Sequence, residues 1–151
     1  MQIFGHIIKM KHCTNLISEC LISLNECKRI IEQDAQNKEF LEELFKTRHI
    51  IHIFMNTLQS FFYYRVVEKE IKTIKINLKK RDINELCFVH LQMLDSIIKR
   101  GFIENAMNDV SKIVKGLLMD VRKFKNVVDS FCANDIHSYV RNEIQNQVGT
   151  M

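Results

Sequence analysis

Two neighbouring stretches decide the fold. Residues 46–71 read KTRHIIHIFMNTLQSFFYYRVVEKEI, and residues 81–103 read RDINELCFVHLQMLDSIIKRGFI. The first stretch has apolar residues at steps of three and four, which line one face of an α-helix, and it contains four consecutive aromatic residues. The second begins with Asp82 and Glu85, a capping-box pattern that satisfies the free N–H groups of a first helical turn. Gly101 near its end is expected to be the left-handed residue that terminates the helix. The two stretches therefore predict two long helices packed together.

The rest of the chain repeats the helical periodicity. The further segments expected to be helical are 3–31, 71–80 (bent away from the preceding helix), 106–131 and, after a break at 133–135, a short last helix over 136–144. The sequence has no proline and only four glycines, which favours long uninterrupted helices over a sheet with many tight turns. The predicted fold class is all-α, a bundle of about five to six helices without a sheet. We expect one helical domain over 1–131 and a C-terminal extension over 132–151, and we expect Gly116 to mark a close helix–helix approach.

Composition places the chain among soluble globular proteins. Its 151 residues are 46% hydrophobic and 26% charged, and no apolar run approaches the roughly 20 residues that span a bilayer. We find no secretory signal, and we expect no membrane partner. The five cysteines form no CxxC pair, which indicates free thiols in a reducing compartment. Because the sequence starts directly in a helix, we also expect the native chain to extend upstream.

Cysteines and histidines, the residue types that most often bind zinc, occur at helical spacing in two places. Cys13, Cys20 and Cys27 are seven residues apart, so they line one helical stripe and cannot converge on one ion. We expect them to pack in the core as small hydrophobes. His49 and His52 share a face but have no acidic or cysteine partner at helical spacing, so a surface or interface pair is preferred to a zinc site. No metal site and no cofactor are expected.

The nearest approach to a catalytic cluster is His90 with Cys87 and Asp95. Asp95 lies five residues from His90 and therefore points away from it on a helix, whereas a nucleophilic triad needs base and orienter within hydrogen-bond reach. We expect a buried, hydrogen-bonded His90 that holds two helices in register. The chain also lacks glycine-rich phosphate loops and hydrolase or metalloprotease motifs. No catalytic residue is predicted, and an enzyme is disfavoured.

A basic run follows the aromatic residues. Between 65 and 81 the chain holds seven Lys and Arg against two Glu, a local excess larger than the net charge of +4. Two interpretations stay open: an acidic partner surface, or a solvated helix face. Nucleic acid is disfavoured because no aromatic residues are interleaved in the run. The candidate partner-binding residues are Tyr63, Tyr64, Arg65, Lys69, Lys72, Lys75 and Lys79.

The tyrosines have two open interpretations of their own. The apolar stripe predicts that Phe61, Phe62 and Val66 are buried, which leaves Tyr63 and Tyr64 partly outward. Tyrosine and arginine are enriched at interface hot spots, so an interface is one interpretation. A half-buried aromatic rim is the other.

Three blocks of the sequence resemble the C-terminal domain of gamma-tubulin complex components, in the family's order. The N-terminal block matches at Ile3, Phe4, Ile7, Ile8, Lys9, Met10 and Lys11. The middle block matches at His49, Ile51, Phe54, Leu58, Gln59, Phe61, Val66, Val67 and Glu68. The third block matches at Asp82, Ile83, Glu85, Leu86, His90, Leu94, Asp95, Ser96, Ile97, Ile98, Phe102 and Ile103. The chain departs from the family's pattern at Leu21 and Ile71, where the family has tryptophan, and at Ile53, where it has histidine.

The resemblance implies a function. Such domains bind gamma-tubulin, one molecule per component, while N-terminal domains of the family pack side by side into an array that templates microtubules. It implies gamma-tubulin and other complex components as partners, and a location in the cytoplasm and cytoskeleton, at a microtubule-organising centre (centrosome or spindle pole). The residues that carry the helical motifs are Asp82, His90, Asp95 and Gly101. The alternative is a helical scaffold subunit that binds another helical protein.

Overall fold

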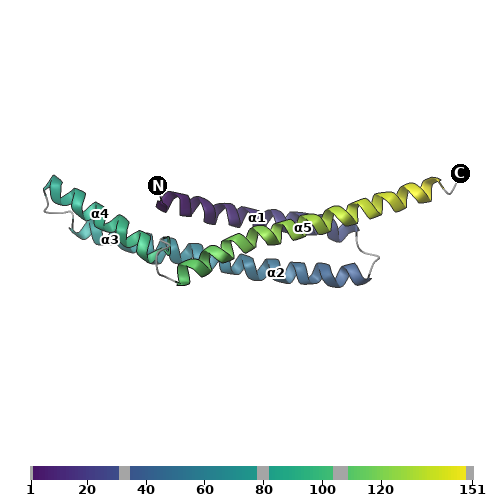
Figure 1. Ribbon diagram of the computed structural model, residues 1–151, viewed down its shortest axis with the longest axis horizontal. Coiled ribbons are helices and arrows are strands. Elements are labelled where there is room, and N and C mark those ends of the chain that lie inside the picture. Colours follow the sequence, from purple (N-terminus) through teal and green to yellow (C-terminus); the bar gives the residue numbers. More distant parts are fainter. Residues whose placement is uncertain (1, 31–34, 78–81, 104–108, 149–151) are drawn as a thin grey trace. The chain divides into compact units, whose positions relative to one another are not determined.

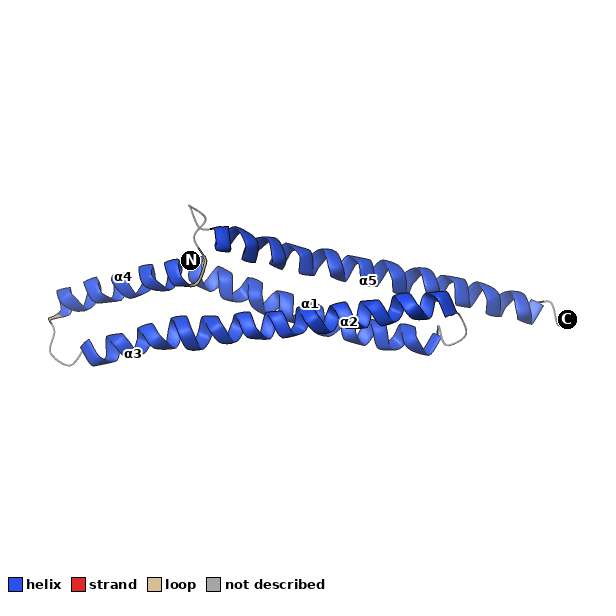
Figure 2. Cartoon of the chain, turned by 90° about the horizontal axis from the view of Figure 1, so that it is seen from below, coloured by secondary structure: helices blue, strands red, loops and turns tan. Residues whose placement is uncertain are grey.

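The structure is a computed structural model that describes residues 2–30, 35–77, 82–103 and 109–148, the side chains of 35, 36, 77 and 135–148 excepted. Its elements are α1 (Gln2–Ile30), α2 (Ala35–Ser60), the π-helix η1 (Phe61–Val67), α3 (Glu68–Asn77), α4 (Ile83–Arg100) and α5 (Asp109–Val148) (Figure 1). The described part of the chain contains helices and no strand (Figure 2). The all-α prediction is confirmed.

The predicted number of five to six helices is not matched. Because α2, η1 and α3 follow one another without a gap, the described residues form four continuous helical segments. A π-helical turn lets the backbone continue where a bend was expected before 71–80. The expected break at 133–135 is also wrong, since α5 runs through it. Alanine is the best helix former, and asparagine and aspartate cost at most about 0.7 kcal/mol each relative to it, too little to end a long helix.

Contacts divide the chain into two compact units. Unit 1 comprises Met1–His12 and Phe54–Leu118, and unit 2 comprises Cys13–Ile53 and Met119–Met151. The predicted division of the chain at residue 131 stays a prediction.

Unit 1 has its own core, to which the π-helix contributes. The buried members of this core are Met10, Phe62, Val66, Ile97 and Ile103. Beside the core, α3 and α4 lie antiparallel and side by side (Figure 2). Their polar link is the carboxylate of Glu70, which accepts hydrogen bonds from Ser96 Oγ and Arg100 Nη1, both at 2.8 Å. The link fixes which face of α3 is turned outward.

Both glycine predictions are wrong, for physical reasons. Gly101 has φ −80°, and the left-handed residue is Phe102, with φ 56°. Gly101 is required for space instead, because an added Cβ would lie 2.6 Å from Phe62 Cε2 and 2.7 Å from the carbonyl oxygen of Ile97. Gly116 marks no close approach, since an added Cβ there would meet nothing within 4 Å.

Helix α4 begins as predicted but is covered over only part of its length. The carboxylate of Asp82 accepts a hydrogen bond from the backbone N–H of Ile83 at 2.7 Å, which confirms the N-cap. The prediction that His90 is buried is wrong, because its side chain is exposed. Leu86, on the same face one turn earlier, is also exposed, whereas Ile97 is buried in the core. Only the C-terminal half of α4 therefore packs against the rest of unit 1.

Unit 2 confirms the predicted cysteine stripe. Its buried core contains Cys20, Leu24, Cys27, Leu41, Leu44, Val128 and Cys132. Cys13, in the same unit, is also buried, and all five cysteines of the chain are free thiols. Burial raises the pKa of Cys20 to about 11 and also raises that of Cys13, so both stay protonated near neutral pH. They act as small hydrophobes.

Candidate functional site

The candidate site lies on the outward face of η1 and α3, in unit 1. Arg65 on η1 and Lys69, Lys72 and Lys75 on α3 are all exposed. Lys79, the last candidate of this run, lies outside the described residues. Residues three and four apart on a helix are neighbours, so the four described cations form a row along one face. We call Arg65, Lys69, Lys72 and Lys75 the basic row.

The two glutamates near the basic row differ in what they neutralise. Glu68 forms an ion pair with Lys72 at 2.7 Å, with 45% of the Glu68 side chain and 70% of the Lys72 side chain exposed. Such a pair is screened by water and contributes little to stability. Glu70, with 13% of its side chain exposed, is turned to α4 and pairs with Arg100 at 2.8 Å. The outward face of α3 therefore keeps a positive surplus.

The aromatic run divides into a buried and an exposed part. Phe62 and Val66 are buried, as predicted, but Phe61 is 37% exposed, which corrects the prediction that it is buried. Tyr63 and Tyr64 point outward, with 43% and 68% of their surface exposed. Exposure alone does not decide between an interface and an aromatic rim, so their role stays a prediction.

A surface hollow lies where the exposed aromatic residues meet the first cation of the basic row. Its volume is about 510 Å³, and it is open to solvent. The residues that line it are Thr57, Ser60, Phe61, Tyr64 and Arg65. Because the hollow has an apolar wall with one cation beside it, it suits an apolar side chain of a ligand that carries a negative charge next to that side chain. No sequence pattern predicts this hollow, because it depends on the partial exposure of Phe61, which the apolar stripe predicts to be buried.

Ring packing holds η1 in place beneath the hollow. The ring of Phe61 stacks on that of Phe102, with centroids 5.8 Å apart and an interplanar angle of 15°. Phe62 contacts His6 from α1 with centroids 5.4 Å apart. Burial, and then the positive charges of Lys115 and Lys9, lower the pKa of His6. A neutral imidazole against an aromatic ring is thus part of the support for η1.

The side chains of Cys87, His90 and Asp95 do not form a catalytic cluster. Cys87 and His90 are exposed on α4, and Asp95 forms an ion pair with Lys99 at 2.7 Å. Within the part of the chain that the structure describes, no group of three or more His, Cys, Asp and Glu is placed to hold a metal ion. These side chains therefore define no candidate for catalysis or metal binding.

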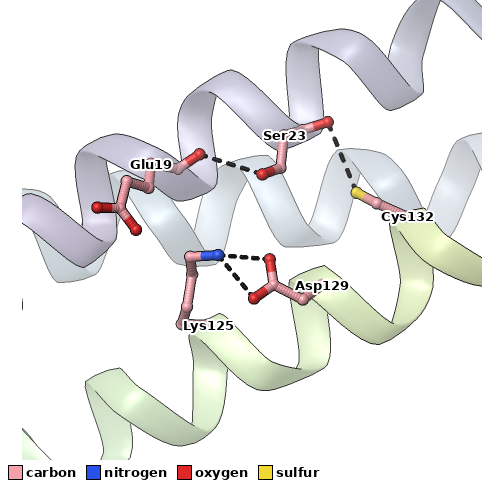
Figure 3. A network of polar contacts seen from close by, with 5 residues as sticks. All are labelled: Glu19, Ser23, Lys125, Asp129 and Cys132. Atoms are coloured by element: carbon pink, nitrogen blue, oxygen red, sulfur yellow. Dashed lines mark hydrogen bonds and ion pairs between the residues drawn. The ribbon is translucent and has the colours of Figure 1, made fainter.

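A polar network in unit 2 was missed by sequence reasoning (Figure 3). Lys125 Nζ donates to both carboxylate oxygens of Asp129, at 2.5 and 2.6 Å, with 16% of the lysine side chain exposed. Burial is the largest single influence and opposes the charge of Lys125, but the hydrogen bond to Asp129 and the negative charge of Asp129, with smaller contributions from Cys20 and Glu19, together outweigh it, so the pKa of the lysine is raised. Next to this pair, Cys132 Sγ donates to the carbonyl oxygen of Ser23 at 3.6 Å. The network connects α5 to α1 and gives the thiol a structural partner.

Arg48 is a second polar side chain whose burial was not foreseen. Only 9% of it is exposed, and its Nε donates to the carbonyl oxygen of Ile17 on α1 at 3.2 Å. Burial, followed by the charges of Arg48 and His49, lowers the pKa of His52. The expected surface pair of His49 and His52 thus has one exposed and one half-buried member. These side chains serve the packing of α1 on α2.

Comparison with known proteins gives one finding. A family model described as "Gamma tubulin complex component C-terminal" matches residues 1–150. No curated protein and no solved structure shows a significant match to the chain. In the described helices there is also no segment both long and apolar enough to cross a membrane.

Proposed function

We propose that this chain, which belongs to the gamma-tubulin complex component family, binds gamma-tubulin and thereby contributes to microtubule nucleation. The family match carries the proposal, since it extends over residues 1–150. The family is one of structural scaffold proteins, and membership implies a role in the gamma-tubulin complex together with its other components. We expect a cytoskeletal location at a microtubule-organising centre, as the family suggests.

The surface chosen for gamma-tubulin is the one formed by η1 and α3. Its support is physical: exposed Tyr63 and Tyr64 lie next to the basic row, and a positive surface attracts an acidic one over several ångströms. Tubulin-family surfaces are generally acidic, so charge complementarity favours this face. The candidate contact residues are Tyr63, Tyr64, Arg65, Lys69, Lys72, Lys75 and Lys79.

Co-precipitation of purified gamma-tubulin with the chain tests the proposal, at low and at moderate salt. Retention at low salt that weakens at moderate salt is expected, because ions screen the attraction between exposed charges. Reversing Lys72 and Lys75 to Glu should weaken retention while far-UV circular dichroism stays unchanged. No retention of gamma-tubulin at either salt concentration would rule out the proposed function for this chain.

A second candidate function is that of a helical scaffold that binds another helical protein. Exposed apolar residues on α4 favour it: Ile83, Phe88 and Leu91 are 71%, 62% and 63% exposed. Large exposed apolar side chains in a cluster are typical of protein interfaces. Sedimentation of the chain alone, together with the co-precipitation experiment, distinguishes the two candidate functions. The scaffold would be favoured if the chain self-associates, if Phe88→Ser and Leu91→Ser abolish that self-association, and if gamma-tubulin is not retained.

A further inference from the structure

We propose that the outward face of η1 and α3 binds an acidic amphipathic helix, with one apolar side chain of that helix seated in the hollow beside Phe61 and Tyr64. That gamma-tubulin supplies the helix rests on the proposed function. The chemistry of the helix follows from the surface itself.

The hollow determines the apolar part of the ligand. Phe61 and Tyr64 line it with aromatic surface that is 37% and 68% exposed, and its volume of about 510 Å³ accommodates a side chain of the size of leucine or phenylalanine. Seating such a side chain against this aromatic surface is favourable, because apolar surface is removed from water. Arg65 also lines the hollow, so the residue next to the apolar anchor is expected to be a carboxylate.

The basic row determines the charge of the ligand. Lys69, Lys72 and Lys75 follow one another at steps of three, which keeps them within an arc of about 120° on α3. Among the ion pairs of the described residues, the row takes part in one, between Lys72 and Glu68, which is exposed and easily exchanged. Carboxylates of a partner can therefore pair with the row without breaking a buried contact.

The spacing of the cations in the basic row favours a helical ligand over an extended one. Arg65 and Lys75 are ten residues apart, which corresponds to about 15 Å along a helix at about 1.5 Å per residue. A partner helix presents acidic residues one turn apart, and so offers about four carboxylates over that length in step with the four cations. An extended strand places residues of one face about 6.6–6.8 Å apart, and soon falls out of step with the row.

The probe is a fluorescein-labelled helical peptide that carries glutamate once per turn along one face and one leucine at the end of that row. The leucine stands at one end because the hollow lies at one end of the basic row. The control peptide has the same composition but places the leucine in the middle of the glutamates. Fluorescence anisotropy with the full chain is expected to show at least tenfold tighter binding of the probe. Equal binding of the two peptides would overturn the role of the hollow.

Variants of the chain test the two parts of the surface separately. Lys69→Glu with Lys75→Glu should weaken probe binding at least tenfold at low salt and by less at higher salt, because screening weakens exposed ion pairs. Tyr64→Ala should weaken it by about tenfold at both salt concentrations, since it removes an apolar wall. The matched control is Lys11→Glu with Lys38→Glu, which changes the net charge equally at exposed positions elsewhere. A loss in the control as large as in the row variant would overturn the proposal.

Gamma-tubulin retention, measured with the same variants, separates this inference from the proposed function. If the parent chain and the row variant retain gamma-tubulin equally, the inference is overturned and the proposed function stands. If gamma-tubulin is not retained by the parent chain, yet probe binding depends on Tyr64 and the row as described, the proposed function is overturned and the inference about the surface stands.

Discussion

Replacing Gly101 by alanine is expected to destabilise the protein through crowding alone. The φ of −80° at this position is one that alanine adopts freely, so the backbone contributes no strain. The new Cβ, however, would lie 2.6 Å from Phe62 Cε2 and 2.7 Å from the carbonyl oxygen of Ile97. Phe62 is almost fully buried and cannot swing into solvent. Overpacking of this kind costs about 1–3 kcal/mol. In a chain of 151 residues that lowers the unfolding temperature by about 2–12 °C.

Gly116→Ala is the matched control. It makes the same chemical change inside helix α5, where an added Cβ meets nothing within 4 Å. Removing a glycine from a helix interior stabilises it by up to about 1 kcal/mol. Thermal and urea unfolding, followed by far-UV circular dichroism, should therefore move the two variants in opposite directions. A Gly101→Ala variant as stable as the parent chain would refute the crowding argument.

Phe62→Leu identifies the atom responsible for the crowding. Leucine lacks the Cε2 atom that the new Cβ approaches. In the double variant, Gly101→Ala with Phe62→Leu, this close contact is relieved, while the close contact with the Ile97 carbonyl oxygen stays. The double variant is expected to be more stable than the sum of the single changes predicts, by roughly 0.5–2 kcal/mol. Strict additivity of the two changes would mean that the ring of Phe62 is not what excludes a side chain at Gly101.

Three further predictions follow from single side chains. Asp82→Ala should lower the free energy of unfolding by about 0.5–2 kcal/mol, because the hydrogen bond from the Ile83 N–H is lost, whereas Asp82→Asn should change it little. Equal losses of the two variants in urea unfolding would argue against the N-cap. The pKa of His6 is lowered from 6.5 in the folded state, so protonation favours the unfolded chain and stability should fall as pH drops below 6.5. His6→Gln should lose less stability than the parent chain between about pH 7.5 and about pH 5.5, and an identical loss in both would contradict the burial argument. A thiol reagent should modify Cys87 alone in the native chain, because Cys20 is buried with its pKa raised to about 11 and the remaining thiols are buried too. Cys87→Ser should therefore remove the fast phase of modification, and a second fast-reacting thiol would contradict the burial of the others.

Features set by neighbouring residues could be predicted from the sequence. The N-cap at Asp82 depends on its own side chain and the next N–H, and the stripe of Cys13, Cys20 and Cys27 follows from the helical repeat. Exposure of Tyr64 followed in the same way from the position of the apolar stripe. In each case the physical cause lies within two turns of the residue concerned.

Features set by distant residues could not be predicted. Glycine at a helix end suggests a left-handed turn, but at Gly101 the space is taken by Phe62, which comes from a different helix. His90 shares the apolar face of α4, and periodicity gives no information on how far along that face a neighbour extends. Arg48 is buried because the carbonyl of Ile17 lies within its reach, which only the packing of α1 on α2 determines.

The π-helix η1 depends on packing against distant residues, but it also has a signal in the local sequence. That signal is the spacing of the residues that face inward. Along α2 these residues recur at mixed steps of three and four. From Phe62 onward a series at steps of four, Phe62, Val66, Glu70 and Ile74, faces inward, with Val67 packed beside Val66. On a regular α-helix each step of four overshoots a full turn by about 40°, so three steps would carry Ile74 off the packed face. The wider i→i+5 turn of η1 brings Val66 back toward the position of Phe62 and offsets that drift. Between these two buried side chains the wide turn leaves Tyr63, Tyr64 and Arg65 exposed, and the candidate surface thus results from the same change of helix that keeps α3 in contact with α4.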